Sequence, residues 1–218
     1  FNAPIAGVFF ALEVVIGHYA LSAFAPIVIA GVIGTIITRL HFGNFPAFII
    51  PDHSLVSFWE FPAFAMLGVV CALTAIIFLR SISFASNVAG SVPIPNYLKT
   101  AGAGLCVGII ALAFPEVLGV GYEATDKALN GQYDLAILIA LIAAKTAATA
   151  ICIGAGFGGG VFTPSMFIGA MVGGAFGLIA TEILPELSSG HSAYTLVGLG
   201  AVAAPVLGAP ISTILIVF

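Results

Sequence analysis

The chain has 218 residues, of which 61% are hydrophobic and only 6% are charged, and its formal net charge is −4. A soluble domain has about 45–50% apolar and about 25% charged residues, so this composition excludes an ordinary soluble fold and predicts a bilayer protein. The acidic balance also argues against nucleic acid as a partner, because no basic surface is available to neutralise phosphates.

Eight apolar stretches follow one another along the chain, and we expect them to be helices. They cover residues 3–17, 19–38, 58–79, 101–114, 135–153, 161–181, 193–206 and 209–218, with a short helical pattern at 117–130. A helix needs about 20 residues to cross the hydrocarbon core, so several stretches are too short to span it. Glycines and prolines lie inside the stretches as well as at their ends. The sequence therefore predicts an all-α integral membrane protein with tilted, broken and partly re-entrant helices.

The basic residues predict an orientation for these segments. Residues 80–99 contain Arg80 and Lys99 and no acid, which is typical of a cytoplasmic connection. Counting spans from there places the acidic segments 115–134 and 182–192 on the outer side of the membrane.

The two ends of the chain resemble each other. Ala-Pro-Ile occurs at residues 3–5 and again at residues 209–211, each time at the start of an apolar stretch. The orientation above gives these two stretches opposite directions, which is typical of an inverted repeat with a binding site between its halves. Chance coincidence of three residues is the alternative.

A glycine-rich segment at residues 154–164 carries the strongest chemical signal. It reads Gly-Ala-Gly-Phe-Gly-Gly-Gly-Val-Phe-Thr-Pro and leads directly into an apolar stretch. A helix that starts at membrane depth leaves its first N–H groups without partners, and these amides with the positive end of the helix dipole favour an anion. The alternative is a helix-packing surface of small residues. Its members would be Gly169, Gly173, Gly174 and Gly177.

The same segment resembles a known family. Residues 160–164, Gly-Val-Phe-Thr-Pro, look like the GxFxP signature of the CLC chloride channel and transporter family, and residues 165–171 extend the match. Residues 1–13 resemble the helix that follows the family's gating-glutamate motif. Residues 115–122 and 209–218 resemble further CLC segments in the right order, so the resemblance covers essentially the whole chain.

The resemblance implies a CLC-type inverted-repeat bundle and transmembrane chloride transport. Residues 1–80 would be the end of the first repeat and the start of the second, and residues 81–218 most of the second. In the family, the backbone N–H groups matching Val161 and Phe162 bind a dehydrated chloride, and Gly160 precedes them in the same motif. These three residues are the predicted anion-binding donors.

The resemblance also implies partners and missing parts. We expect a homodimer formed through residues 3–17, 19–38 and 209–218, embedded as a multi-pass protein in the plasma (inner) membrane, with no cofactor. The family's GSGIP and GREGP motifs are not found in this sequence and would lie before Phe1. The tyrosine that closes the inner side of the pore would lie beyond Phe218, so the chain is expected to be a piece of a longer protein.

Three side chains bear on the mechanism. Proton-coupled members of the family carry an internal glutamate at the position of Val14, and valine cannot relay a proton, so the resemblance favours channel-like passive flux over proton-coupled antiport. Glu13, one residue earlier, points about 100° away on a helix and is either a structural hydrogen-bond partner or a pathway residue. Lys145, inside an apolar stretch, either adds positive potential to the pathway, or snorkels or pairs with a carboxylate near the helix end.

Two other classes of function compete with transport. An intramembrane enzyme needs a nucleophile with a base, or facing metal ligands, and the sequence indicates neither, so we predict no catalytic residue, no metal site and no enzymatic activity. A non-conducting membrane scaffold, in which the glycine-rich segment serves packing alone, is the second alternative.

Overall fold

The computed structural model describes residues 3–44, 60–183 and 190–217, and the elements within these ranges are helices. Five of them are long and apolar enough to cross a membrane: α2 (Leu21–Phe42), α3 (Phe61–Ser91), α4 (Asn96–Ala113), α6 (Leu135–Gly154) and α7 (Phe162–Ile183). The shorter elements are α1 (Pro4–Phe10) with its π-helical continuation η1 (Ala11–Ile16), the 3-10 turn η3 (Pro115–Val117), α5 (Tyr122–Leu129), α8 (His191–Leu207) and α9 (Pro210–Val217). The predicted all-α membrane fold is confirmed.

Helix α3 departs most from its predicted bounds. Residues 80–99 were expected to connect two spans, but α3 continues to Ser91 and α4 already begins at Asn96. That prediction is wrong because the serines and small residues after Arg80 lower the hydropathy without interrupting the helix. Pro93 and Pro95 interrupt it, since proline lacks an N–H group and disfavours the helical conformation in the residue before it.

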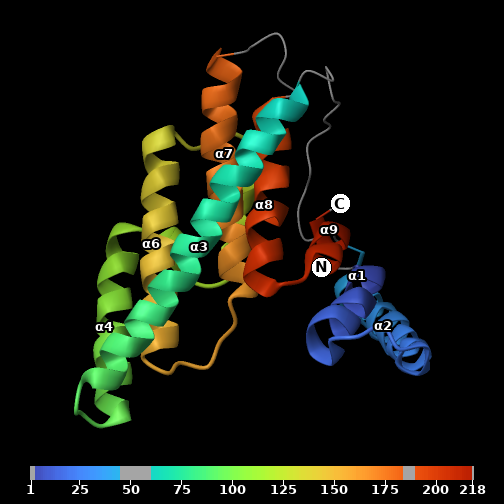
Figure 1. The fold of residues 1–218 in the computed structure, drawn as a ribbon, viewed down its shortest axis with the longest axis horizontal. Helices are drawn as coiled ribbons and strands as arrows, with labels where there is room; N and C mark the ends of the chain where they lie inside the picture. Colours follow the sequence, from blue (N-terminus) through green and yellow to red (C-terminus); the bar gives the residue numbers. More distant parts are fainter. Residues whose placement is uncertain (1–2, 45–59, 184–189, 218) are drawn as a thin grey trace.

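The core of the molecule is a bundle of α3, α6, α7 and α8, in which α3 contacts the other three helices and α7 contacts both α6 and α8 (Figure 1). Helix α4 packs on the outer side of α6, and α5 contacts both α7 and α8. Bulky side chains fill the centre, including Phe78, Phe167 and Tyr194, each of which is almost completely buried. The ring of Tyr194 stacks on that of Phe64 with centroids 4.8 Å apart, which ties α8 to α3.

Glycines set the distance between α7 and α8. A Cβ atom added at Gly173 would lie 2.2 Å from the carbonyl oxygen of Tyr194, and one added at Gly198 would lie 2.6 Å from the carbonyl oxygen of Gly169. Neither position accepts a side chain, because the two backbones are in direct contact. The packing role considered for Gly169 and Gly173 is therefore confirmed, and it holds the helix that follows the glycine-rich segment in place.

Helices α1, α2 and α9 form a second group beside the bundle (Figure 1). The helices that follow the two Ala-Pro-Ile segments lie there: α1 begins at Pro4, α9 begins at Pro210, and the two helices pack against each other. Proline suits both starts because its missing N–H would have no partner in the first turn of a helix.

Replacing Gly173 with alanine in the full-length protein should lower its thermal stability, because overpacking at a backbone contact costs about 1–3 kcal/mol. Heating in detergent followed by size-exclusion chromatography measures the loss. Gly102→Ala on α4 is the matched control, since an added Cβ there meets no atom within 4 Å. Equal losses in the two variants would contradict the close contact of α7 with α8.

Candidate anion site at the start of helix α7

The chain between α6 and α7 is shaped by glycine. Gly156 adopts a φ of 86°, a left-handed conformation that glycine reaches without steric cost, and it stops α6. The amide of Gly156 donates to the carbonyl of Ile153 and the amide of Phe157 donates to that of Cys152, which satisfies the last carbonyls of α6. The chain is then free to run to the start of α7 at Phe162.

The glycines before α7 differ from those inside it. A Cβ added at Gly158, Gly159 or Gly160 meets no atom within 4 Å, whereas Gly169 and Gly173 have backbone atoms within 3 Å of that position. Gly158, Gly159 and Gly160 are also exposed. Within the described residues, the packing alternative therefore explains the glycines of α7 but not the three that precede it.

The backbone amides just before α7 have no hydrogen-bond acceptor within the helix. The helix's bonds begin with the amide of Ser165, which donates to the carbonyl of Val161 at 3.0 Å. Among the described residues, the amides of Gly160 and Val161 donate no hydrogen bond to another backbone carbonyl. Unpaired donors at the positive end of a 22-residue helix attract an acceptor, and an anion is the acceptor that the dipole favours.

Lys145 lies buried on α6, with only 3% of its surface exposed. Its Nζ donates to the carbonyl of Val117 at 2.8 Å and to that of Gly119 at 3.0 Å, and it lies 4.9 Å from the centre of the Phe167 ring. No carboxylate of the described residues forms an ion pair with it. Within the described residues Lys145 thus pairs with no acid, and backbone carbonyls take two of its three ammonium protons.

Lys145 and the open glycines border the same cavity. A space of about 240 Å³ is lined by Lys145, by Gly158–Gly160 and Pro164, and by residues of α4, α6 and the connection before α5. No Asp or Glu is among the lining residues that the structure describes. One buried cation and three exposed glycines thus line a space without negative charge, which is an arrangement suited to an anion.

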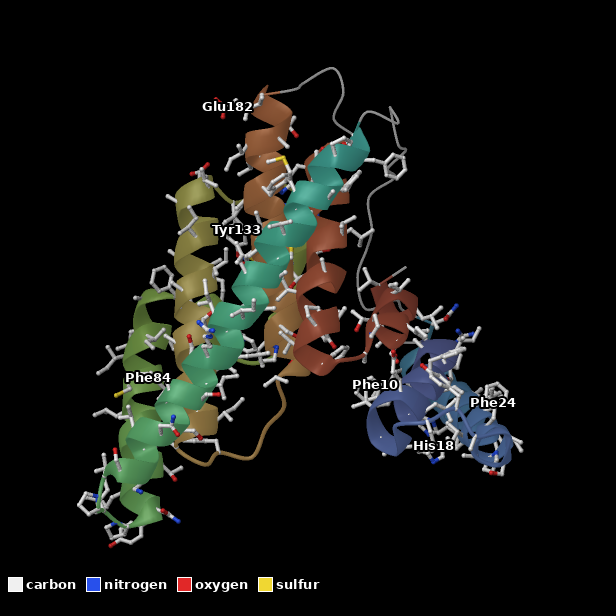
Figure 2. The ribbon with its side chains drawn as sticks, viewed as in Figure 1. Phe10, His18, Phe24, Phe84, Tyr133 and Glu182 are labelled. Atoms are coloured by element: carbon white, nitrogen blue, oxygen red, sulfur yellow. The ribbon has the colours of Figure 1, made fainter. Side chains whose placement is uncertain are left out.

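Phe162 connects the start of α7 with the second group of helices. Its ring lies 5.9 Å from that of Phe10, centroid to centroid, and it lines a separate cavity of about 500 Å³ among α1, α2 and α9. Figure 2 shows Phe10 on the side of α1 that faces the bundle. This ring contact joins α1 to the first residue of α7.

Glu13 lies at the α1–α9 contact and does not line the cavity beside Lys145. Its carboxylate accepts hydrogen bonds from the backbone amides of Ile211, at 3.3 Å, and Ser212, at 2.8 Å, and from the hydroxyl of Ser212. It thus satisfies the first turn of α9, as an acid at a helix N-terminus does. Val14 follows in η1, and its side chain is 38% exposed.

Sequence reasoning missed the carbonyls of Val117 and Gly119, although the segment that carries them had been singled out. A backbone carbonyl leaves no mark in the residue type, so only the unpaired lysine in an apolar stretch pointed to such partners. Among the predicted site residues, Gly160 and Lys145 share one cavity, Val161 and Phe162 adjoin it, and Glu13 and Val14 lie elsewhere.

Comparisons of this chain with known sequences and structures all indicate one family of membrane proteins. The profile of a family described as voltage gated chloride channel matches residues 1–218. A putative chloride channel protein ClcB-like from Ralstonia nicotianae is 33% identical over the whole chain, which covers 51% of that protein. The H(+)/Cl(-) exchange transporter ClcA of Vibrio cholerae is 30% identical, again over the whole chain and 48% of the relative.

A solved structure, that of a slow cyanobacterial Cl-/H+ antiporter, superimposes with a TM-score of 0.86 at 26% identity, covering 100% of this chain and 52% of that one. The chain therefore spans about half the length of these relatives.

Replacing Lys145 with methionine should weaken chloride binding by the full-length protein and reduce its stability. The change removes the cation and leaves the carbonyls of Val117 and Gly119 without this donor, and the buried one, that of Val117, costs about 1–3 kcal/mol when it stays unsatisfied. Isothermal titration with chloride in detergent measures the affinity.

The matched control is Lys127→Met on α5, where the lysine is paired with Glu123 at 2.7 Å on the surface. An exposed pair of this kind contributes less than about 1 kcal/mol, so the control should keep its affinity. If the Lys145→Met protein binds chloride with unchanged affinity, Lys145 does not contribute to chloride binding.

Proposed function

Because the chain belongs to the voltage gated chloride channel family, we propose that it supplies part of the anion pathway of a multi-pass protein that moves chloride passively across the plasma (inner) membrane. The observation that carries the proposal is the cavity at the start of α7, where open glycine amides and the buried Lys145 face the same space. The protein acts in transport rather than in catalysis.

The proposed mechanism follows from the cost of dehydration. A chloride ion that enters the membrane loses water, and backbone amides and a helix dipole replace that hydration without a mobile side chain. Two of the three Nζ protons of Lys145 are engaged by carbonyls, so one proton and part of the charge act on the cavity. Binding is then favourable enough to admit the anion and weak enough to release it.

Passive flux is favoured over proton exchange by the residues near α1. Val14 offers no titratable group, and the carboxylate of Glu13 is engaged with the first turn of α9. A proton-coupled exchanger is the second candidate. It is supported by the ClcA relative and by the cyanobacterial antiporter, both of which are named as exchangers of chloride and protons.

The experiment that separates these candidates uses the full-length protein in liposomes under a chloride gradient, with and without an opposing pH gradient. Passive flux predicts a zero-current voltage at the chloride Nernst potential that ignores pH. A voltage that shifts with pH identifies an exchanger. Absence of any anion current would favour the alternative in which the protein is a non-conducting membrane scaffold.

The proposed assembly is a homodimer formed through α1, α2 and α9. Its support is the outer face of α2, where the described side chains of Ile29, Val32, Ile33, Ile36, Ile37 and Leu40 are all exposed. Replacing Ile33 and Ile36 with tryptophan should shift the full-length protein from dimer to monomer in light scattering. An unchanged mass would place the dimer contact elsewhere.

Gly160→Val should reduce chloride flux by at least about tenfold, because the valine side chain occupies the open space beside the backbone and keeps the anion from the amides, and each hydrogen bond to a charged group that is no longer formed is worth about 1.5–3 kcal/mol. The variant should still fold, since an added Cβ meets no atom within 4 Å and the backbone at Gly160 is outside the left-handed region. Flux into chloride-loaded liposomes measures the effect, with Gly102→Val as the control. Wild-type flux in the Gly160 variant would show that anions pass elsewhere.

A further inference from the structure

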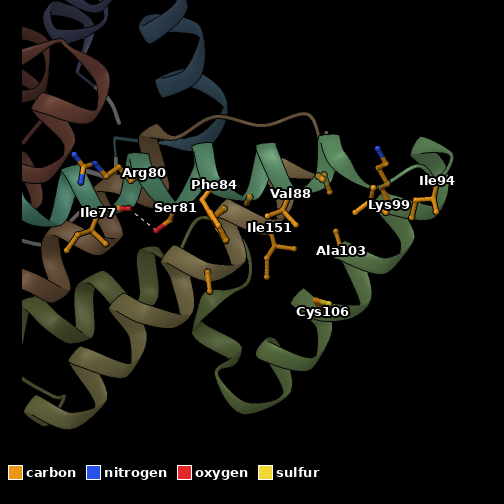
Figure 3. A pocket seen from close by; sticks show the side chains of 16 residues that line it. Ile77, Arg80, Ser81, Phe84, Val88, Ile94, Lys99, Ala103, Cys106 and Ile151 are labelled. Atoms are coloured by element: carbon orange, nitrogen blue, oxygen red, sulfur yellow. Dashed lines mark hydrogen bonds between the residues drawn. The ribbon is translucent and has the colours of Figure 1, made fainter.

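A large groove lies between α3, α4 and the end of α6, away from the cavity beside Lys145. Its volume is about 870 Å³, within the range of about 300–1,000 Å³ typical of ligand sites. The wall formed by α3 is an apolar stripe in which Phe84, Val88 and Val92 follow one another at helical spacing. Ala103 and Cys106 of α4 and Ile151 of α6 face this stripe (Figure 3).

Two cations border this otherwise apolar groove. Arg80 of α3 and Lys99 of α4 line it, and Figure 3 shows them toward its opposite ends, with Phe84 and Val88 between them. Neither forms an ion pair with a described carboxylate, and residues 61–115 contain no Asp or Glu at all. The groove therefore combines an apolar lining with uncompensated positive charge.

The length of α3 indicates where the groove lies in the bilayer. The 31 residues of α3 would extend about 46 Å along a helix, more than the hydrocarbon thickness of about 30 Å, so α3 crosses the bilayer at a tilt. The groove lies along its C-terminal part, from Ile77 to the α3–α4 connection. Lys99 stands nearer that connection, which joins two candidate spans and therefore lies at the depth of lipid headgroups, and Arg80 stands toward the opposite end of the groove.

We propose that this groove binds an anionic phospholipid of the surrounding leaflet. Its phosphate pairs with Lys99, and its acyl chains lie along the stripe of Phe84 and Val88 toward Arg80. The stem of Arg80 covers apolar surface while its guanidinium adds positive potential. A zwitterionic lipid offers the same chains without net charge, so the two cations select for the anionic headgroup.

Native mass spectrometry of the full-length protein, titrated with phosphatidylglycerol or with phosphatidylcholine, tests the selection. We expect preferential binding of phosphatidylglycerol, weakened about fivefold by Lys99→Gln, less by Arg80→Gln, and most by the double variant. Arg39→Gln is the matched control, because Arg39 lies near the end of α2, outside the groove. Unchanged preference in the double variant would overturn the proposal.

Cys106 reports the location of the lipid, because it is exposed and lines the groove. Its alkylation by N-ethylmaleimide, read by peptide mass mapping, should be slower in vesicles containing phosphatidylglycerol than in pure phosphatidylcholine, and Lys99→Gln should abolish the difference. If Cys106 is alkylated slowly in both kinds of vesicle, another segment of the protein fills the groove. If it is alkylated rapidly in both, lipid does not fill the groove. Either result overturns the proposal.

Discussion

The structure depends on one constraint, which is that a helix beginning at membrane depth must find acceptors for its first amides. Water is not available in the hydrocarbon core, and an unsatisfied N–H group there costs several kcal/mol. Helix α7 begins after three glycines where an added Cβ would meet no atom within 4 Å, and among the described residues the amides of Gly160 and Val161 donate to no backbone carbonyl. An anion satisfies these donors and the positive end of the helix dipole together. We therefore propose that chloride binding at the start of α7 rests on a requirement of the backbone rather than on a reactive side chain.

The remaining helices keep that start in a fixed position. Direct backbone contact at Gly173 and Gly198 holds α7 close against α8, and a side chain at either position would clash. Lys145 reaches from α6 to the carbonyls of Val117 and Gly119, which holds the connection before α5 against the cavity and places a cation beside the amides. Glu13 performs a similar task at the other group of helices, where it satisfies the first turn of α9. Charged residues are scarce in this chain, and these two are used to hold backbone in place.

Sequence reasoning located the helices and the start of α7 well, because apolar stretches and a run of glycines are visible in residue types. It misplaced the end of α3, since the serines after Arg80 resemble a connection until the prolines at positions 93 and 95 are weighed. It did not find the partners of Lys145 or Glu13, which are backbone groups distant in sequence and carry no residue signal. It also left the glycines as either packing or binding residues, and the space around each one shows that Gly169 and Gly173 pack whereas Gly158–Gly160 do not.

The most direct test of the account is the position of a heavy halide in crystals of the full-length protein grown in bromide. Anomalous scattering locates bromide independently of any assumption about the pathway. The account predicts a peak within hydrogen-bonding reach of the amides of Val161 and Phe162, weakened in a Lys145→Met protein. A peak elsewhere in the membrane region, with none at the start of α7, would contradict the claim that these amides hold the anion.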